Sequence, residues 1–510
     1  MRTTSSQSSV ASVAWLRAEE PTLPLLLVVL NELRRQSISY CYWKASRRVH
    51  LALTGESDLD LLIAKEDQHR AQAILLGRGF KLFPCVAYRD HPAILSFLGH
   101  DESSGQLLHL HLYFRLVVGA PLLKNYRIPW EDAILARSVS HPTLPIHMLD
   151  PASEALLLVI RSCLELHRSD PVTLRHWHAT QQKFALDRQE LVPRVERATL
   201  HGAATELMGR DLADRIADAF YSGAPLEKDR RLRRLIRKHF APYRSYNGVE
   251  ARVRSAGRAL QWIAGGLNKR HLHWPRPWAR RAPGGGLVIA MVGVDGSGKS
   301  TAVAAVRAWL GAEIDVMPIY FGTGDGRPSL LLLPLKLMMP LFMRLYRTKP
   351  KGASHGKISD RPPGLLYGAL QTVWAMVVAR EKRAKLIAAR RAAERGLIVI
   401  ADRYPQDEIL GFNDGPLLTR LRGIPQWLRR TEAAAYALAR RLSPDLVIKL
   451  EVMPATAARR EPDMDPTVIR DRIGAVKRLT FFATRIVSID AEEPLAEVTR
   501  KIKREIWRQL

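Results

Sequence analysis

Residues 287–306 read LVIAMVGVDGSGKSTAVAAV, and this stretch decides how the second half of the 510-residue chain folds. A short apolar run is followed by a glycine-rich turn, a lysine and two hydroxyl residues, and then by an alanine-rich helical pattern. The pattern G-x-x-x-x-G-K-[ST] is met from Gly293 to Ser300, between a strand pattern and a helix pattern. In this context it predicts a phosphate-binding loop rather than an ordinary glycine turn.

The chemistry of such a loop requires these residue types. Glycines let backbone N–H groups wrap around phosphate oxygens, and a helix that begins near Lys299 presents the positive end of its dipole to the anion. Lys299 would neutralise the β- and γ-phosphates, and the Ser300 hydroxyl would ligate Mg²⁺. We therefore predict an ATP·Mg²⁺ site. The expected phosphate-binding residues are Gly293, Gly296, Ser297, Gly298, Lys299, Ser300 and Thr301.

The rest of this half alternates strand and helix patterns. Residues 397–401 and 446–451 are short, apolar and rich in Val and Ile, as buried parallel strands are, and long helix-forming segments separate them. This alternation predicts an α/β domain with a doubly wound parallel sheet over residues 286–510.

Residues 286–510 resemble the thymidylate kinase family of P-loop nucleoside monophosphate kinases. The resemblance rests on GVDGSGKST, on GLIVIADRYP at 396–405, on LSPDLVIKLEV at 442–452 and on VSIDAEEPLAEVTRKIKREIW at 487–507, in the order of the family. It implies an ATP- and Mg²⁺-dependent kinase that transfers the γ-phosphate to a nucleoside monophosphate, dTMP among them, or to another phosphate- or sugar-bearing acceptor.

The resemblance also implies roles for single residues. Asp295 would hold a sugar hydroxyl of the acceptor, Arg403 would bind the acceptor phosphate, and Asp402 would organise the metal or its water shell. Lys299, Asp402 and Arg403 are thus the expected catalytic residues, and Ser300 and Asp402 the expected metal ligands. A strand-end salt bridge is the structural alternative for Asp402 and Arg403.

Two further groups of residues are expected near the acceptor. Arg459 and Arg460 lie where these kinases carry a mobile lid, with a solvated helix face as the alternative, and Arg380 lies roughly where an arginine approaches the acceptor base. The chain departs from the family at 320–329, YFGTGDGRPS, which includes Asp325 and is followed by an apolar segment at 329–347. We expect that segment to be a core helix or a cover over the active site rather than a membrane span, because prolines and a lysine interrupt it.

The front half carries a second pattern. Asp58 and Asp60 alternate in a strand pattern, so both carboxylates point to one face, where they can bind Mg²⁺ and the phosphates of a nucleotide. With Ser46 upstream, the stretch looks like the nucleotidyltransferase superfamily, in which a Gly-Ser turn precedes an Asp-x-Asp strand. Ala45 replaces the usual glycine.

A third carboxylate is expected on a later strand of such a domain. The strand pattern at 107–116 offers His109 and His111 instead, and these two also share one face. They are candidate metal ligands or, alternatively, structural histidines. An active transferase and a degenerate binding module both stay open for this half.

The predicted organisation is α/β, with an α+β nucleotidyltransferase-like domain and a helical extension before the P-loop kinase domain. An exposed linker is expected where X-Pro steps, arginines and three glycines cluster. The expected boundaries are 1–20 for a flexible tail, 21–150 for the nucleotidyltransferase-like domain, 151–267 for the helical extension, 268–285 for the linker and 286–510 for the kinase-like domain.

The net charge of +28, from 78 Lys and Arg against 50 Asp and Glu, fits nucleic acid, anionic membrane or phosphate-rich ligands. The most basic stretch, 228–244, has an apolar stripe and no recognised nucleic-acid fold around it, so we predict an amphipathic helix packed by its leucines and no nucleic-acid partner. A peripheral contact with anionic membrane and a homodimer stay open.

Three cysteines, Cys41, Cys85 and Cys163, lack disulfide or metal-ligand spacing, which indicates a reducing compartment. We expect a cytoplasmic enzyme, or one at the inner face of the membrane. Two functions of other kinds remain as alternatives to the kinase. One is a nucleotide-gated regulatory ATPase at a membrane-bound assembly, and the other is nucleotidyl transfer through the Asp-x-Asp strand.

Overall fold

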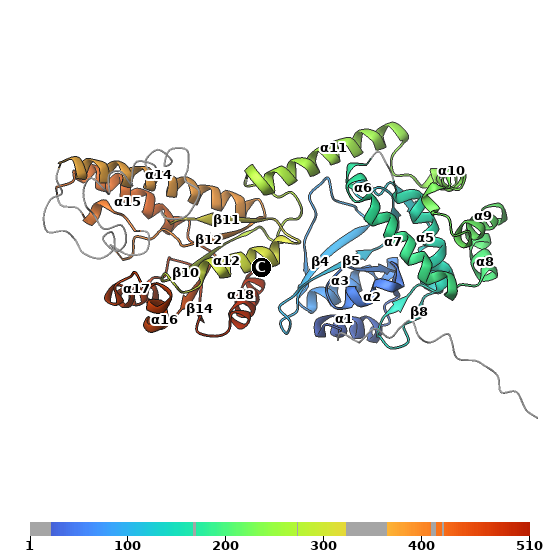
Figure 1. Cartoon of the computed structure of the whole chain (residues 1–510), viewed down its shortest axis with the longest axis horizontal. Coiled ribbons are helices and arrows are strands. Elements are labelled where there is room, and N and C mark those ends of the chain that lie inside the picture. The colour runs from blue at the N-terminus through green and yellow to red at the C-terminus, as the bar shows by residue number, and fades with distance from the viewer. Residues whose placement is uncertain (1–21, 167–169, 273, 323–364, 410–414, 421–422) are drawn as a thin grey trace, which may run out of the picture. The chain divides into compact units, whose positions relative to one another are not determined.

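The computed structural model describes residues 22–166, 170–272, 274–322, 365–409, 415–420 and 423–510 (Figure 1). The contacts divide the chain into two compact units. The first holds the described residues up to Phe80 together with Leu108–Asn247, and the second holds Lys81–Leu107 together with Gly248–Leu510. The expected N-terminal tail, Asp325 and the apolar segment 329–347 lie outside the described residues.

The first unit is built on a mixed sheet. Its strands are β1 (Tyr40–Tyr42), β2 (Leu59–Ile63), β5 (Leu107–Tyr113), β8 (Val139–Ser140) and β9 (His147–Met148). They lie in the order β5-β2-β1-β9-β8, in which β2 is parallel to β5 and antiparallel to β1. A separate antiparallel pair is formed by β6 (Leu116–Val118) and β7 (Tyr126–Ile128).

Helices make up the rest of the first unit. They are α1 (Pro24–Arg35), α2 (Val49–Leu53), α3 (Gln68–Gly77), α4 (Glu131–Ala136), α5 (Pro151–Glu165), α6 (Pro171–Arg175), α7 (Trp177–Leu191), α8 (Arg197–Met208), α9 (Arg210–Tyr221) and α10 (Arg230–His239). The helix α5 is buried over almost its whole length, and its buried residues include Glu154 and Arg161 as well as a central apolar run. Its first turn is capped by Asp150, whose carboxylate accepts hydrogen bonds from the amides of Ala152 and Ser153 at 3.0 Å.

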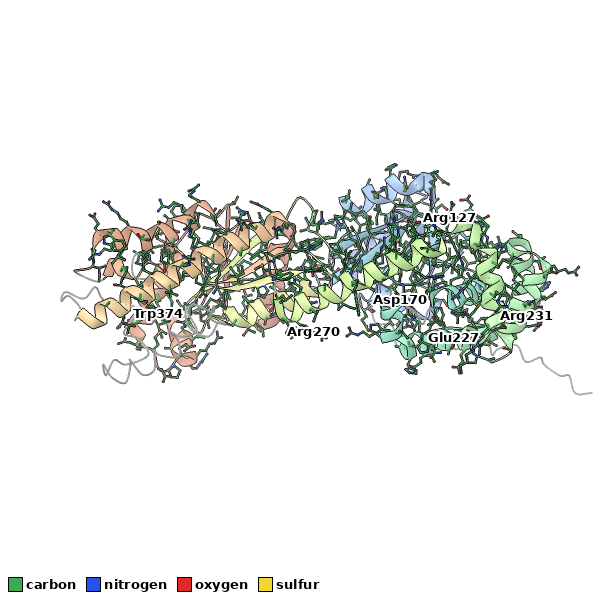
Figure 2. All side chains as sticks on the ribbon, turned by 90° about the horizontal axis from the view of Figure 1, so that it is seen from above. Arg127, Asp170, Glu227, Arg231, Arg270 and Trp374 are labelled. Atoms are coloured by element: carbon green, nitrogen blue, oxygen red, sulfur yellow. The ribbon has the colours of Figure 1, made fainter. Side chains whose placement is uncertain are left out.

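The strongly basic stretch forms α10, as its amphipathic pattern predicts. Asp229 caps the start of this helix. Leu232 and Ile236, one turn apart, and Phe240, one turn further on, are buried. Figure 2 shows the side chains from above and labels Arg231, which is exposed on α10. The apolar stripe of this helix is therefore used for packing within the first unit.

The second unit contains the doubly wound sheet. Its strands are β10 (Leu287–Gly293), β11 (Val316–Tyr320), β12 (Ile398–Asp402), β13 (Leu446–Glu451) and β14 (Arg485–Asp490). They lie in the order β11-β12-β10-β13-β14, and every pair is parallel. The three strands expected from the sequence occur within one residue of their predicted bounds. The all-parallel five-stranded sheet is consistent with a P-loop domain.

Helices cover both faces of this sheet. They are α12 (Lys299–Gly311), α14 (Leu365–Glu394), α15 (Gln426–Arg441), α16 (Pro454–Arg460), α17 (Pro466–Arg478) and α18 (Leu495–Gln509). The second unit also contains α11 (Gly248–Leu267), which runs into a π-helical turn at Asn268–Leu272. Along β10, Ile289 and Met291 pack with α12 and α18, whereas Val288 and Ala290 pack with α14. The strand is apolar on both faces because both are buried.

A hairpin from the front of the chain also belongs to the second unit. Its strands are β3 (Lys81–Leu82) and β4 (Ile94–His100), and they pair antiparallel. Phe83 and Leu98 enter the same core cluster as Trp507 of α18, and the Phe83 and Trp507 rings are stacked with centroids 6.1 Å apart. Contacts far apart in the sequence thus place the hairpin with the P-loop sheet, which no local pattern indicates.

The stretch 268–285, expected to be an exposed linker, forms hydrogen bonds with other parts of the second unit, although many of its side chains are exposed. One carboxylate oxygen of Asp315 accepts hydrogen bonds from the amides of Trp278 and Ala279, both at 2.6 Å. Ala282 is buried, and its amide donates to the carbonyl of Gly396 at 2.9 Å. After the π-helical turn at Asn268–Leu272, several amides of the stretch thus find partners within the second unit.

Among the described residues, we find no helix that combines the length and the apolar composition needed to cross a membrane.

A buried carboxyl group in α5 makes the stability of the first unit depend on pH. Burial raises the pKa of Glu154 from 4.5 to about 7, although its carboxylate accepts a hydrogen bond from the Ser46 amide at 2.7 Å. Because the folded pKa is the higher one, the folded chain binds more protons than the unfolded chain between these values. The contribution to stability is therefore present below pH 4.5 and is lost as the pH rises through 7.

We predict that Glu154→Gln removes this dependence. The free energy of unfolding of the wild type, relative to that of the variant, should fall by up to about 3 kcal/mol between pH 4.5 and pH 8. Urea unfolding of the full chain at both pH values, followed by circular dichroism, measures the difference. Parallel pH dependence of the two proteins would contradict the assignment.

Candidate active site

The phosphate-binding pattern forms the turn between β10 and α12. The backbone of Gly298, the residue before the helix, has φ +87°, in the left-handed region that glycine adopts without strain. Gly293 is required for a different reason, because a Cβ there would lie 2.4 Å from Ser297 Oγ and 2.9 Å from the Leu450 carbonyl oxygen. The turn is therefore tightly wound against the neighbouring strand β13.

The first turn of α12 carries the lysine and the hydroxyls. The Lys299 side chain is buried, and its ammonium group donates to the Val294 carbonyl at 2.6 Å and lies 3.9 Å from Asp295 Oδ1. Ser300 and Thr301 are exposed at the start of the helix. A cation and two hydroxyls thus surround the amino-terminal end of α12, where the helix dipole favours an anion.

The strand register brings a carboxylate to the same place. In the parallel pairing of β10 with β12, Met291 lies opposite Asp402, so both strands end at one edge of the sheet. There the Ser300 hydroxyl donates to Asp402 Oδ2 at 3.3 Å. A hydroxyl and a carboxylate side by side are ligands of the kind that Mg²⁺ prefers. Ser300 and Asp402 are therefore suitable ligands for such an ion.

Asp295 lies at the centre of an arginine cluster. One of its carboxylate oxygens accepts from Arg403 at 2.5 Å, and the other accepts from Arg472 of α17 at 2.7 Å. Burial alone would raise the pKa of Asp295, but Arg403, Lys299 and Arg472 together lower it below its ordinary value. The carboxylate is therefore ionised and holds two guanidinium groups beside the phosphate loop. In the resemblance, Asp295 was expected to face a sugar hydroxyl; here both of its oxygens bind arginines.

Arg403 has an unusual backbone. Its φ is +67°, a left-handed conformation that is uncommon for a residue with a side chain, and its amide donates to the Met291 carbonyl at 3.0 Å. Such a conformation costs about 1–3 kcal/mol and occurs preferentially where a side chain must be aimed. In this turn it accompanies the contact between the guanidinium group and Asp295.

The two expected lid arginines differ in their contacts. Arg460, in the last turn of α16, donates to the Gly296 carbonyl of the phosphate loop at 3.0 Å. Arg459 is exposed next to it, and Arg380 is exposed on α14. Arg460 thus contacts the loop, whereas the lid role of Arg459 and the acceptor-site role of Arg380 stay predictions.

A cavity of about 700 Å³ borders the metal-ligand pair. Ser300 and Asp402 lie in its wall, which continues along α12 to Arg307 and to Trp274 and Trp278 of the preceding segment. The second unit therefore offers space for a small molecule directly beside the expected metal position.

The predicted residues of the first unit also come together. In the parallel register of β2 with β5, Asp60 lies opposite His111, and the same offset places Asp58 near His109. His109 Nδ1 is 2.7 Å from Asp58 Oδ1, and His111 Nδ1 is 3.2 Å from Asp60 Oδ1. Ser46 is buried, and it contacts Glu154 and Arg194 through its amide and its hydroxyl.

Two half-buried lysines and a histidine lie near Asp60. Burial would raise the pKa of Asp60, but Lys44, His111 and Lys124 lower it well below its ordinary value. Burial lowers the pKa of Lys124 to about 8, and its ammonium group donates to the Tyr113 hydroxyl at 3.0 Å. The Lys44 ammonium group lies 4.1 Å from the centre of the Trp43 ring. This cluster is polar and densely charged inside the unit, as binding sites often are.

Comparison with known proteins shows which proteins the chain is similar to. No protein-family model matches it. It is 33% identical over 226 residues to the uncharacterized ATP-binding protein YghS of Escherichia coli (strain K12), a match that covers 43% of this chain and 92% of YghS. It is 30% identical over 223 residues to the uncharacterized ATP-binding protein YghR of the same strain, which covers 43% of this chain and 86% of YghR.

The chain belongs to the YghS and YghR family. At 510 residues it is more than twice as long as the matched region, so more than half of it has no counterpart in that match. YghS and YghR are both named as uncharacterized ATP-binding proteins, and their names give no substrate.

Sequence reasoning about this member of the YghS family missed three residues of the two sites. Arg472 is one of several arginines along α17, and nothing in the pattern distinguishes it from its exposed neighbours. Lys44 lies two residues before Ser46, at a position to which the Gly-Ser and Asp-x-Asp pattern gives no role, and Lys124 lies in a loop with no motif. Only the tertiary contacts reveal that these three approach Asp295 and Asp60.

The close approach at Gly293 gives a prediction for the loop itself. Gly293→Ala should lower the free energy of unfolding by about 1–3 kcal/mol, because the new methyl group must displace Ser297 or the β13 backbone. Gly311→Ala, at the other end of α12, is the matched control, since nothing lies within 4 Å of the added carbon. Denaturant unfolding of both full-length variants measures the effect. A Gly293→Ala protein as stable as the control would show that the turn is looser than described.

Proposed function

We propose that this chain is an ATP- and Mg²⁺-dependent phosphotransferase of the thymidylate-kinase type. The observation that carries the proposal is the convergence of three groups at one edge of the parallel sheet. These are the Lys299 ammonium group, the Ser300–Asp402 pair and the arginines tied to Asp295. Phosphoryl transfer needs charge neutralisation and alignment more than covalent help from the protein, and these groups supply both.

Each group has a distinct role in this proposal. The loop amides and Lys299 bind the β- and γ-phosphates of ATP, and Ser300 and Asp402 hold Mg²⁺, which neutralises charge on the phosphate oxygens when bound. Arg403 and Arg472 both contact the Asp295 carboxylate beside the phosphate loop, and their guanidinium groups would bind an acceptor anion there. The acceptor oxygen attacks the γ-phosphorus, the bond to the bridging oxygen breaks, and ADP leaves with the electron pair.

The ATP-binding descriptions of YghS and YghR support the donor half of the proposal. The acceptor half rests on the arginine cluster and on the cavity beside Ser300 and Asp402, which has room for a molecule of nucleotide size. A nucleoside monophosphate, dTMP among them, or another phosphate- or sugar-bearing molecule meets these requirements.

Lys299→Met tests donor binding and chemistry. We expect a loss of turnover by about 10²–10³-fold, because a preorganised positive charge next to the transferring group is removed. The assay follows ³²P transfer from ATP·Mg²⁺ to deoxynucleoside monophosphates, nucleotide sugars and simple sugars. Lys501→Met is the matched control, because this lysine pairs with Glu493 at the protein surface. Full turnover by Lys299→Met would refute the proposal, and ATP hydrolysis that no acceptor stimulates would favour the regulatory ATPase instead.

Arg403→Ala tests acceptor recognition. The value of kcat/KM for the acceptor should fall by about 10²-fold, while the affinity for ATP changes little, because Arg403 follows β12 and is not one of the residues expected to bind the phosphates of ATP. Arg441→Ala, an exposed arginine at the end of α15, serves as the control. Steady-state kinetics with the acceptor identified in the screen provide the measurement. An unchanged kcat/KM would remove Arg403 from the acceptor site.

A further inference from the structure

We propose that Asp58, His109 and His111 form a binding site for a divalent transition-metal ion in the first unit. The site is separate from the phosphate loop and does not rest on the proposed kinase function. One potential ligand atom of each of the three residues lies within 4.8 Å of the others. In the described part of the chain, these three residues are the group of His, Cys, Asp and Glu side chains that meets this condition.

The backbone fixes the three side chains. Asp58 directly precedes β2, and the two histidines lie two residues apart on β5, the parallel neighbour of β2. Residues two apart on a strand point to the same face, so both imidazoles face the aspartate. The ring centroids of His109 and His111 are 4.1 Å apart, with an angle of 65° between the ring planes. The site therefore depends on two adjacent strands and not on a loop.

The distances suit a metal ion after small side-chain movements. His109 Nδ1 lies 2.7 Å from Asp58 Oδ1, and His111 Nδ1 lies 3.8 Å from Asp58 Oδ2. Ligand atoms about 2.0–2.2 Å from a zinc ion are themselves roughly 3–3.5 Å apart. Nitrogen and oxygen atoms converging over these distances can coordinate one ion between them.

The exposure of the three side chains differs in a way that suits an accessible ion. The Asp58 side chain is 46% exposed, whereas the side chains of His109 and His111 are 6% and 17% exposed. The imidazoles are thus held by packing, and the carboxylate faces solvent. An ion can enter from the aspartate side and keep a coordination position open, as catalytic rather than structural metal sites do.

The ligand types select the class of metal. Two imidazoles and a carboxylate suit zinc, iron, cobalt or manganese, whereas Mg²⁺ prefers oxygen ligands. The nucleotidyltransferase resemblance implied Mg²⁺ at Asp58 and Asp60. In this chain Asp60 reaches the same nitrogen of His111, at 3.2 Å, and adds a second carboxylate next to the site.

The test uses the full-length chain, stripped with a chelator and free of nucleotide, so that the phosphate loop contributes no metal site. Titration with Zn²⁺ by calorimetry, and with Co²⁺ by visible absorption, should show one ion bound per chain, and millimolar Mg²⁺ should not displace it. His109→Ala and His111→Ala should each weaken binding by about tenfold or more, as removal of a metal's supporting groups does.

Two further variants distinguish the loss of a metal ligand from misfolding and from the general effect of removing a histidine. Asp58→Asn preserves the shape of the side chain but removes its charge, so a loss of affinity without a change in thermal unfolding would exclude misfolding as the cause. His201→Ala is the matched control, because His201 forms a His–Asp pair with Asp214 at 2.8 Å elsewhere in the first unit. The proposal is overturned if the wild type binds neither ion, if the histidine variants bind as the wild type does, or if Mg²⁺ competes equally.

Discussion

The parallel register of β10 with β12 is the constraint on which the candidate active site depends. It places Met291 opposite Asp402, so that the strand before the phosphate loop and the strand before Arg403 end together. The amide of Arg403 then reaches back to the Met291 carbonyl, and the hydroxyl of Ser300 reaches Asp402. A shift of one residue would turn the side chains of β12 to the other face of the sheet and separate these groups.

Asp295 is the second element on which the site depends. It is one ionised carboxylate among Lys299, Arg403 and Arg472, and each of its oxygens accepts from a different guanidinium group. Without it, three positive charges would repel one another in a partly buried space, where such repulsion is screened less than in water. The same arrangement leaves positive charge around the loop, which an anionic ligand would neutralise further. The positive charges that Asp295 holds together in the structure are thus the charges that would bind the anionic ligand in the proposed reaction.

Much of this could be predicted from the sequence, because the decisive signals are local. The glycine pattern lies between a strand and a helix, and β10, β12 and β13 are runs of Val and Ile whose bounds follow from composition. The pairing of aspartates with histidines in the first unit was also within reach, since period-two alternation puts each pair on one face. What the pattern could not provide was the register that sets Asp60 opposite His111.

Other features depend on contacts between distant parts of the chain. The β3–β4 hairpin joins the core of the second unit through Phe83 and Leu98, although more than 180 residues separate it from β10. The stretch 268–285 has the composition of a linker, yet Asp315 binds two of its amides. In the sequence, Arg472 is one of several arginines of α17, and only the folded structure shows that it contacts Asp295. Such pairings follow from tertiary packing, which local propensity does not encode.

The central claim is that one edge of the parallel sheet binds a nucleoside triphosphate together with a divalent ion. Calorimetric titration of the full-length chain with a non-hydrolysable ATP analogue, in the presence and absence of Mg²⁺, tests this claim most directly, with Asp402→Asn measured alongside. The account predicts binding that Mg²⁺ strengthens in the wild type, and a much smaller effect of Mg²⁺ in the variant. Binding that is equally tight with and without Mg²⁺, or no binding at all, would contradict it.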